Sequence, residues 1–192
     1  MTRIVAGTHG GRRLAVPEGR DTRPTSDRVR EALFGALESR YGLAGSRFAD
    51  LYAGSGAIGL EAHSRGAERV LLVESGAKAA RVIRENIVAL RAGQSVELLV
   101  STAQQAVKMP PGQPYDIVFA DPPYAVTEAE ISALLSGLAG NGWLAEDAIV
   151  VIERGRRSPE PQWPEGLYGD KPKKYGETTL WYARHEPQAE PS

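Results

Sequence analysis

Apolar residues recur at helical spacing in one segment near the N-terminus, RPTSDRVREALFGALESRYG. Val29, Leu33 and Leu37 fall on one stripe, since residues three and four apart share a face of a helix. Ser26 is suited to cap the start of this helix, and Gly42 is suited to end it. The pattern therefore predicts a helix between these two residues.

From residue 47 onward, short apolar runs alternate with segments of helical period. The runs are typical of buried strands: RFADLYAG, RVLLVE, SVELLV, YDIVFADPPY and AIVVIERG. Helical segments separate them, which is the pattern of a parallel sheet covered on both faces. Ligands of such sheets bind at the carboxyl ends of the strands. The informative residues are therefore those just past each strand: Gly54, Glu74, Ser101, Asp121 and Glu153.

Two further segments depart from this alternation. RIVAGTHGGRRLAVP has β-like runs around Gly10-Gly11 and predicts an N-terminal hairpin. Near the other end, YGDKPKKYGETTLWYARH predicts a strand, a basic turn and a strand, which would add an antiparallel hairpin at a sheet edge. We expect one α/β domain over residues 1–192, with an N-terminal extension at 1–24 and a disordered tail at 186–192.

Composition favours a globular protein and excludes several classes of site. Of the 192 residues, 42% are hydrophobic and 24% are charged, and there is no cysteine. Disulfides and thiolate metal sites are therefore excluded, and the three histidines show no metal-ligand spacing. No apolar run approaches the roughly 20 residues of a membrane span, and no signal peptide opens the chain. We expect a cytoplasmic protein that binds neither metal nor membrane, with a monomer as the default.

The net charge of −1 hides an uneven distribution along the chain. Residues 1–47 carry nine basic and five acidic residues, whereas residues 48–153 carry seven basic and thirteen acidic residues. Residues 154–192 are again slightly basic, with seven basic and six acidic residues. Basic ends around an acidic middle indicate that the ends contact a polyanion, for which nucleic acid is a candidate.

A glycine-rich loop follows the first strand of the alternation, in DLYAGSGAIG. Gly54, Ser55 and Gly56 begin a G-x-G-x-x-G pattern before a helix, where glycines allow a tight turn and the close approach of a ligand. Glu74 ends the next strand, where an acid can accept hydrogen bonds from ribose hydroxyls. The combination predicts a nucleoside-containing cofactor.

The spacing of the loop fits two cofactors, NAD and S-adenosylmethionine. Asp50 and Tyr52, at the end of the preceding strand, favour S-adenosylmethionine. An acid there can face the methionine ammonium, whereas it would be repelled by a pyrophosphate. The loop alone leaves both alternatives open.

The sequence FADPPYA places an acid, two prolines and an aromatic residue where a buried strand must stop. Pro122 and Pro123 fix two φ angles and restrict the residues before them, so the carboxylate of Asp121 has a defined place. Because prolines lack an N–H, the loop offers mainly acceptors, beside the ring of Tyr124. Such a pocket is complementary to a planar base with an exocyclic amine, on which the ring can stack for about 1–3 kcal/mol. Acceptors that localise the amine lone pair and stabilise its developing positive charge would promote attack on a sulfonium methyl.

Several motifs together resemble a known family. DPPY resembles the signature of amino-group methyltransferases that use S-adenosylmethionine, and YAGSG resembles their cofactor loop. RIVAGTHGGRRL, RPTSDRVREALFGAL, DLYAGSGAIGLEAHSRGA, DIVFADPPY and YGETTLWY together are similar to bacterial 16S rRNA guanine-N2 methyltransferases of the RsmD type. The resemblance covers nearly all of residues 3–183, and its Arg-Pro-Thr-x-x-x-Arg-x-Arg-Glu segment is much more specific than DPPY.

The resemblance implies a class I methyltransferase fold, Rossmann-like, with a seven-stranded, mostly parallel sheet whose last strand is antiparallel. It implies a guanine of 16S rRNA in the small ribosomal subunit as the target, held by Asp121, Pro122, Pro123 and Tyr124 as the catalytic pocket. It places S-adenosylmethionine beside Gly54, Ser55, Gly56 and Glu74, with Arg23, Thr25 and Arg28 closing the cofactor site or contacting RNA. Where many relatives have an acid or amide near the adenine, this chain has Ser101-Thr102-Ala103, so we expect Thr102 to make that contact.

The expected reaction is methyl transfer from S-adenosylmethionine to the N2 amine of a guanine that is flipped out of its stack. The residues expected to hold RNA phosphates are Arg3, Arg12, Arg13, Arg20, Arg28, Lys171, Lys173 and Lys174. Alternative targets are DNA adenine N6 and protein glutamine N5, although enzymes of the latter kind usually have Asn in place of Asp121. A nucleotide-binding RNA chaperone without turnover is another alternative, and an NAD oxidoreductase comes last because no hydride-transfer acid/base pair is recognisable.

Overall fold

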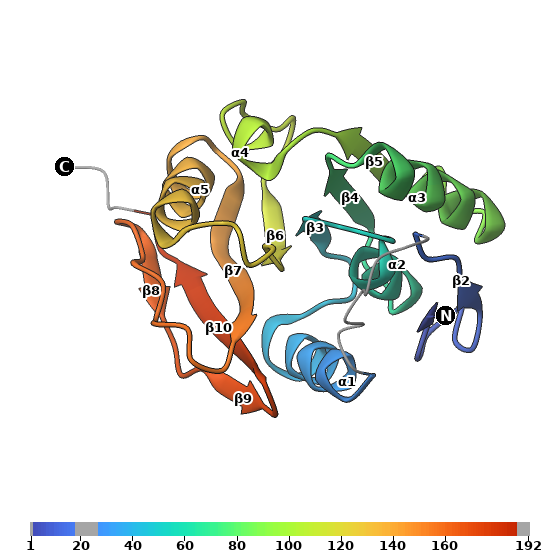
Figure 1. Ribbon diagram of the computed structural model, residues 1–192, viewed down its shortest axis with the longest axis horizontal. Coiled ribbons are helices and arrows are strands. Elements are labelled where there is room, and N and C mark those ends of the chain that lie inside the picture. Colours follow the sequence, from blue (N-terminus) through green and yellow to red (C-terminus); the bar gives the residue numbers. More distant parts are fainter. Residues whose placement is uncertain (1, 18–26, 188–192) are drawn as a thin grey trace. The chain divides into compact units, whose positions relative to one another are not determined.

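The computed structural model describes residues 2–17 and 27–187 of the chain. These residues form two compact parts, an N-terminal part within residues 1–102 and a C-terminal part within residues 103–192. Figure 1 shows the elements of each part in chain order. The expected helix cap Ser26 and residues 188–192 of the expected tail lie outside the described residues. The expectation of a single domain stays a prediction.

The N-terminal part opens with the expected hairpin, formed by β1 (Thr2–Arg3) and β2 (Arg13–Leu14), which pair antiparallel. Helix α1 (Asp27–Ala36) follows and continues as one turn of π-helix, η1 (Leu37–Tyr41). Gly42 ends it at φ +75°, a left-handed conformation that glycine adopts without strain. The helix buries Val29, Leu33, Phe34 and Leu37, so the apolar stripe of the sequence is its inner face.

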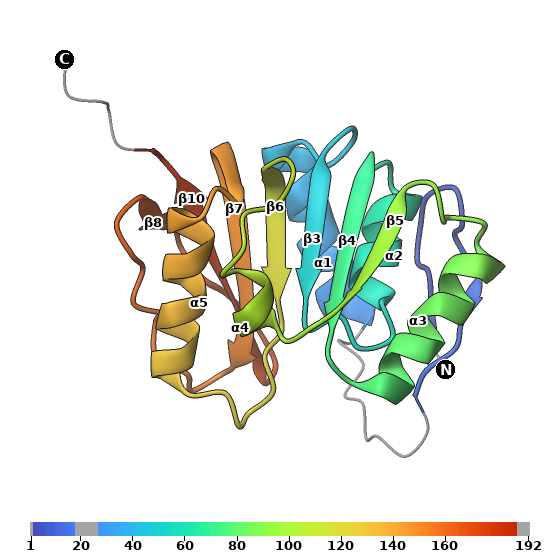
Figure 2. The same ribbon diagram turned by 90° about the horizontal axis from the view of Figure 1, so that it is seen from above.

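Three parallel strands form the sheet of the N-terminal part, in the order β5–β4–β3. The elements are β3 (Arg47–Leu51), α2 (Ala57–Ser64), β4 (Arg69–Glu74), α3 (Ala77–Ala89) and β5 (Val96–Val100). Figure 2 shows α3 on one face of these strands and α1 and α2 on the other. Strands β3 and β4 are buried except at their first residues, as expected for central parallel strands.

The C-terminal part has strands in the order β6–β7–β10–β8, with β9 paired to β10. Its elements are α4 (Ala103–Ala106), β6 (Tyr115–Ala120), α5 (Glu128–Gly140), β7 (Leu144–Gly155), β8 (Leu167–Gly169), β9 (Lys173–Tyr175) and β10 (Thr178–His185). Strands β6 and β7 are parallel, whereas β10 is antiparallel to each of its neighbours. Figure 2 shows α4 and α5 on the same face of these strands.

The end of the chain differs from the expected two-stranded hairpin. It contains the two short strands β8 and β9 and the longer strand β10, and Lys173 and Lys174 of the expected basic turn belong to β9, where they pair with Leu180 and Thr179. The turn lies instead around Gly176, whose φ of +57° is left-handed. Glycine adopts this conformation more readily than the lysines would, which explains the shifted turn.

Candidate active site

The glycine loop between β3 and α2 contains glycines with distinct functions. Gly54 and Gly56 have φ of +61° and +85°, so the turn into α2 requires the left-handed conformation twice. A Cβ added at Gly54 would meet no atom within 4 Å, which leaves open space beside the loop for a ligand. A Cβ at Gly59 would instead lie 2.2 Å from Leu72 Cδ2, so this glycine permits close packing of α2 on β4.

Glu74, at the end of β4, holds the glycine loop in place. Its side chain is buried, and its two carboxylate oxygens accept hydrogen bonds from the N–H groups of Gly54 at 2.8 Å and Gly76 at 2.7 Å. A carboxylate oxygen can accept more than one hydrogen bond, so Glu74 can still receive ribose hydroxyls. Sequence reasoning gave Glu74 the ribose contact alone and missed its bond to the loop.

Asp50, at the end of β3, lies under the first turn of α2. The residue is 2% exposed, and its Oδ2 accepts a hydrogen bond from Gly59 N at 3.1 Å. The carboxylate thus satisfies one of the free N–H groups at the helix N-terminus and complements its positive dipole. A pyrophosphate at this helix N-terminus would be repelled by a buried negative charge. The arrangement fits a cofactor without phosphate, such as S-adenosylmethionine, better than NAD.

The other cofactor residues expected in the N-terminal part lie around the same loop. Tyr52 has φ +63°, which is an outlier for an aromatic residue and marks the point where the chain leaves β3. The carbonyl oxygen of Ser55 accepts a hydrogen bond from Asn86 Nδ2 at 3.0 Å, so α3 also fixes the loop. Thr102 is exposed just past β5, and its contact with the adenine stays a prediction. Arg23 and Thr25 lie outside the described residues.

In the C-terminal part, the Asp121-Pro122-Pro123-Tyr124 loop begins where β6 ends. Pro122 is buried, whereas Tyr124 is 74% exposed, so its ring is open to a ligand. Val126 N donates to the carbonyl oxygen of Pro123 at 3.0 Å, which closes a turn and fixes the segment after the two prolines. The loop therefore combines a half-buried acid with an exposed ring, and its contact with a target base stays a prediction.

Asp121 lies beside a second acid, Glu153 of β7. The parallel register pairs Ala120 with Ile152, so the next residue of each strand is at the same level. Burial raises the pKa of Asp121, while a side-chain hydrogen bond from Glu153 and the charge of Arg154 act in the opposite direction. Two carboxyl groups that share a hydrogen bond need one proton between them. The sequence predicted Glu153 just past its strand and assigned it no function, but β7 continues to Gly155 because it pairs with β10 there, so Glu153 lies within the strand.

Arg154 supplies the positive charge of this site. Its Nη2 lies 2.8 Å from Glu128 Oε1, at the first residue of α5, and the arginine side chain is 11% exposed. A guanidinium with so little exposure keeps part of its field on Asp121, because water screens it less than at the surface. The sequence shows that a basic residue follows Glu153, but it does not indicate that this residue forms an ion pair with Glu128.

The expected RNA-binding residues are spread over both parts of the chain. Arg3, Arg12 and Arg13 are exposed on the hairpin, and Arg28 is exposed on α1. Lys171, Lys173 and Lys174 are exposed in the C-terminal part, whereas Arg20 lies outside the described residues. Their contact with RNA stays a prediction.

The described residues contain no group of three or more His, Cys, Asp or Glu side chains placed to bind a metal ion. None of their helices combines the length and the apolar character that crossing a membrane requires.

Comparison with known proteins gives consistent likenesses along the chain. The family model described as conserved hypothetical protein 95 matches residues 2–184. Ribosomal RNA small subunit methyltransferase D of Escherichia coli strain K12 is 33% identical over 188 residues, which covers 98% of this chain and 92% of that protein. The solved structure of the Escherichia coli protein yhhF has a TM-score of 0.84 and 34% identity, over 97% of this chain and 99% of that one.

A more distant solved structure shows the same fold with its methyl donor bound. Magnesium protoporphyrin IX methyltransferase of Synechocystis, solved with S-adenosylmethionine, has a TM-score of 0.63 at 15% identity, over 83% of this chain and 79% of that one. At this identity the likeness concerns the fold alone. Together with the likeness to yhhF, it confirms the expected class I methyltransferase fold.

Proposed function

Because the chain belongs to the RsmD-type family of ribosomal RNA small subunit methyltransferases, we propose that it methylates the N2 amine of one guanine in 16S rRNA. The proposed methyl donor is S-adenosylmethionine. Membership of the family supports rRNA methylation, and the donor and the target atom are the finer parts of the proposal. The observation that carries the amine target is the acceptor loop at Asp121, whose side chain contacts Glu153 of β7 and which also carries the exposed ring of Tyr124.

The glycine loop and the two buried acids of the N-terminal part would hold the donor. Glu74 is placed to accept ribose hydroxyls while it fixes Gly54, and the open side of Gly54 leaves room for the ligand. Asp50 keeps negative charge at the start of α2, where the methionine ammonium is favoured and a phosphate is not. When bound, S-adenosylmethionine supplies an electrophilic methyl group on a positively charged sulfur.

The Asp121 loop would hold the target base. Tyr124 offers an exposed ring for stacking, and the Asp121 carboxylate and nearby carbonyls accept the amine hydrogens. These acceptors localise the nitrogen lone pair and direct it at the methyl carbon, which is alignment of reactants together with electrostatic stabilisation. As the new N–C bond forms, the bond from carbon to sulfur breaks and its electron pair stays on the sulfur.

The Asp121–Glu153 pair would also receive the proton that the methylated amine releases. Positive charge develops on nitrogen during the attack, and a carboxylate at hydrogen-bonding distance stabilises it. Burial raises the pKa of Asp121, which makes this carboxyl a better proton acceptor than an exposed aspartate. The proposal requires the donor and the base pocket to meet during turnover.

The experiment that tests the proposal is transfer of labelled methyl from S-adenosylmethionine to unmethylated small ribosomal subunits. Naked 16S rRNA, DNA and total cell protein run in parallel as acceptors, and the labelled RNA is digested to nucleosides. The expected product is N2-methylguanosine. Label in adenine N6 or in a glutamine side chain would keep the amine chemistry and replace the substrate. Tight donor binding without label in any acceptor would favour the RNA-binding protein without turnover.

A further inference from the structure

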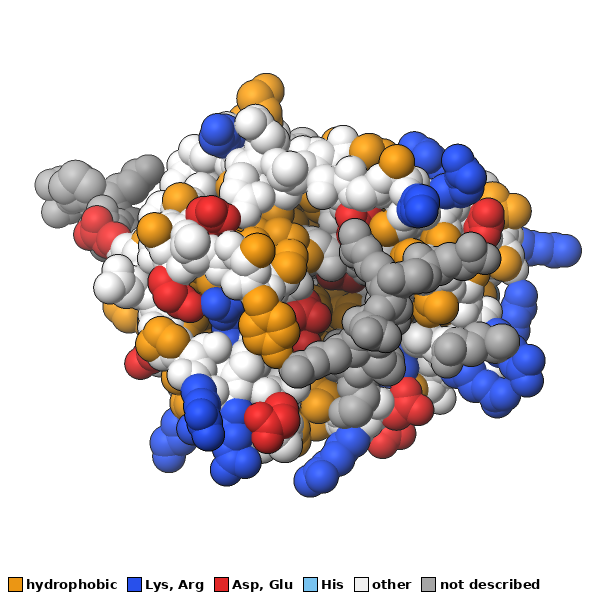
Figure 3. All heavy atoms as spheres, viewed as in Figure 1, with side chains coloured by type: hydrophobic (Ala, Val, Ile, Leu, Met, Phe, Trp, Pro, Cys, Tyr) orange, Lys and Arg blue, Asp and Glu red, His pale blue; other side chains and the backbone are white. Residues whose placement is uncertain are grey.

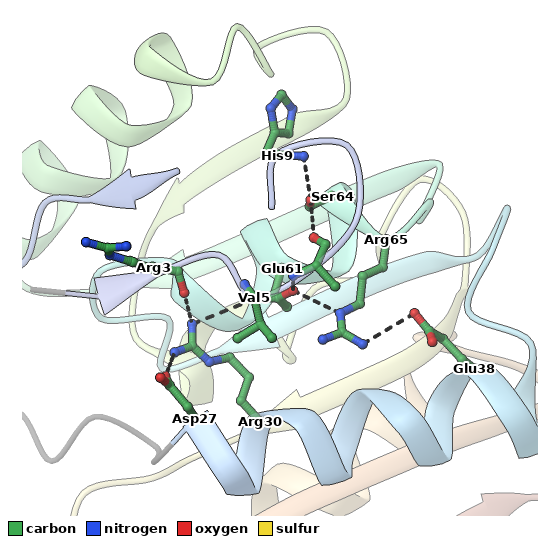
Figure 4. A network of polar contacts seen from close by, with 10 residues as sticks. Arg3, Val5, His9, Asp27, Arg30, Glu38, Glu61, Ser64 and Arg65 are labelled. Carbon is green, nitrogen blue, oxygen red and sulfur yellow. Dashed lines mark hydrogen bonds and ion pairs between the residues drawn. The ribbon is translucent and has the colours of Figure 1, made fainter. Parts of the chain in front are cut away.

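The N-terminal hairpin is fixed on α2 by a buried carboxylate (Figure 4). Glu61 is fully buried, and its two oxygens accept hydrogen bonds from the N–H groups of Val5 at 2.7 Å and Ala6 at 3.1 Å. Arg65 Nε donates to the same carboxylate at 2.9 Å, and Arg30 Nη1 lies 3.8 Å from it. A buried carboxylate needs such partners to offset its lost hydration. The hairpin therefore has a fixed position on α2.

The second strand of the hairpin is fixed along α3. The Asn86 side chain accepts a hydrogen bond from Ala15 N at 2.8 Å and donates one to Ala15 O at 3.0 Å. Arg12 Nη2 donates to the carbonyl oxygen of Ala89, the last residue of α3, at 2.9 Å. The helix C-terminus carries partial negative charge, so a guanidinium is favourable there. Side chains of the hairpin and of α3 therefore share one surface.

This α3–hairpin surface is strongly basic. Its exposed cationic residues are Arg3, Arg12, Arg13, Lys78, Arg81, Arg84 and Arg91. Residues 2–17 and 77–91 contain a single acidic residue, Glu85. Figure 3 shows Lys and Arg side chains gathered over α3 and the hairpin. Within the ranges that the structure describes, none of these seven cations is in an ion pair, so their charge is available to a ligand.

The composition of the surface indicates which part of a nucleic acid it fits. Residues 2–17 and 77–91 contain no Phe, Tyr or Trp, and the ring of His9 is stacked on that of His63, so the surface lacks the large aromatic side chains on which unpaired bases stack. Arginine and lysine without aromatic neighbours contact phosphates, and such contacts carry no sequence information. The surface therefore suits the backbone of a folded RNA.

We infer that the α3–hairpin surface binds the sugar–phosphate backbone of the RNA substrate, with α3 contributing Lys78, Arg81 and Arg84, and Arg91 following its end. The inference takes the identity of the polyanion from the proposed function and the location of the contact from the structure. The hairpin arginines act in one rigid unit with α3, and the orienting contacts are those of Glu61 and Asn86.

The test compares the wild-type protein with a triple variant, Lys78→Gln, Arg81→Gln and Arg84→Gln. All three side chains are exposed, and glutamine has a helix propensity close to that of lysine and arginine, so α3 is expected to stay folded. A matched control removes three exposed cations elsewhere, Arg40→Gln, Lys108→Gln and Arg184→Gln, with the same change of net charge. Binding to an unmethylated 16S rRNA transcript is measured over a series of salt concentrations, and donor binding is measured by calorimetry.

We expect the α3 variant to lose about tenfold or more in RNA affinity. The slope of the logarithm of its binding constant against the logarithm of the salt concentration is expected to become less negative by about two to three. The control is expected to change much less, and donor affinity is expected to stay the same in both. Equal behaviour of variant and control would overturn the inference. If wild-type protein methylates no RNA but the affinities still differ, the proposed function fails while this inference stands. If methylation is confirmed and the α3 variant binds like the control, the proposed function stands and this inference fails.

Discussion

The side chain of Asp121 is hydrogen-bonded to that of Glu153 across the parallel strands β6 and β7. The two residues are 32 positions apart in the sequence, and they meet because Ala120 of β6 pairs with Ile152 of β7, which places the residues that follow, Asp121 and Glu153, side by side. The pair is flanked by Arg154, whose guanidinium is bonded to Glu128, and by the exposed ring of Tyr124. Two acids, an arginine and an exposed ring, which lies near Gly155, therefore lie close together in the C-terminal part.

Replacing Asp121 by Ala is expected to abolish methyl transfer while the dissociation constant of S-adenosylmethionine changes less than about threefold. The reason is that Asp121 is proposed to hold the target base, whereas the proposed donor contacts come from the glycine loop and Glu74. Single-turnover methylation and calorimetry of the donor check the two halves of this prediction. A large loss of donor affinity would show that Asp121 contacts the donor instead.

We expect the Asp121–Glu153 pair to set the pH dependence of methyl transfer. Burial raises the pKa of Asp121, so the carboxylate form that accepts the amine hydrogens is lost at higher pH than for an exposed aspartate. Glu153→Gln replaces the second carboxyl by an amide that can donate to Asp121 and favours its ionised form. We expect kcat to fall by about 10²-fold or more and the acid limb of the pH profile to move to lower pH. An unchanged profile would remove Glu153 from the reaction.

Glu74→Gln is expected to weaken donor binding without removing the base chemistry. Gly54 and Gly76 donate to different oxygens of the Glu74 carboxylate, and in glutamine one of these oxygens is replaced by an NH2 group, which cannot accept the N–H that faces it. A lost hydrogen bond to a charged group costs about 1.5–3 kcal/mol, which corresponds to about tenfold to hundredfold in affinity. Calorimetry of the donor measures this effect, and kcat at saturating donor provides the comparison. Unchanged affinity would contradict the assigned function of Glu74.

Two glycine substitutions in one motif are expected to destabilise the protein for different reasons, and only one of them is expected to impair donor binding. Gly59→Ala places a Cβ against Leu72 in the core, so we expect a loss of about 1–3 kcal/mol in the free energy of unfolding. Gly54→Ala meets open space and incurs only the left-handed strain of about 1–2 kcal/mol, but its methyl group occupies the space left for the donor. Denaturant unfolding with and without donor separates the two, since only Gly54→Ala should lose the stabilisation that the donor gives.

His63 provides a pH-dependent contribution to stability in the N-terminal part. Its ring stacks on that of His9 at a centroid distance of 5.6 Å, and burial together with the nearby His9 lowers the pKa of His63. The unfolded chain therefore binds more protons, and the contribution is present above about pH 6.5 and lost as pH falls through the lowered value. We expect the stability difference between wild type and His63→Gln to shrink on acidification. A difference that does not vary with pH between 5 and 8 would contradict this.

The sequence predicted the alternation of strands and helices well because buried parallel strands and one-sided helices have different apolar periods. It also placed Gly54, Glu74 and Asp121 at strand ends, since motif order fixes this directly. It could not show that Glu74 holds Gly54, that the Asp121 side chain is hydrogen-bonded to that of Glu153, or that Glu61 anchors the hairpin. Each of these contacts joins residues at least 20 positions apart, and periodicity carries no information about such pairs. The shifted turn at Gly176 was missed because lysines and a proline also favour a turn.

Helix α2 has only eight residues, about 12 Å of length, yet each of its ends has a separate task. Its first turn follows the glycine loop and donates a hydrogen bond from Gly59 N to Asp50. In its second turn, Glu61 and Ser64 accept hydrogen bonds from the backbone of the hairpin. A helix this short has too few internal hydrogen bonds to be stable alone, so its order depends on the contacts at both ends. Removing the hairpin would therefore loosen the glycine loop as well, and binding of RNA at one end would be thermodynamically linked to binding of the donor at the other.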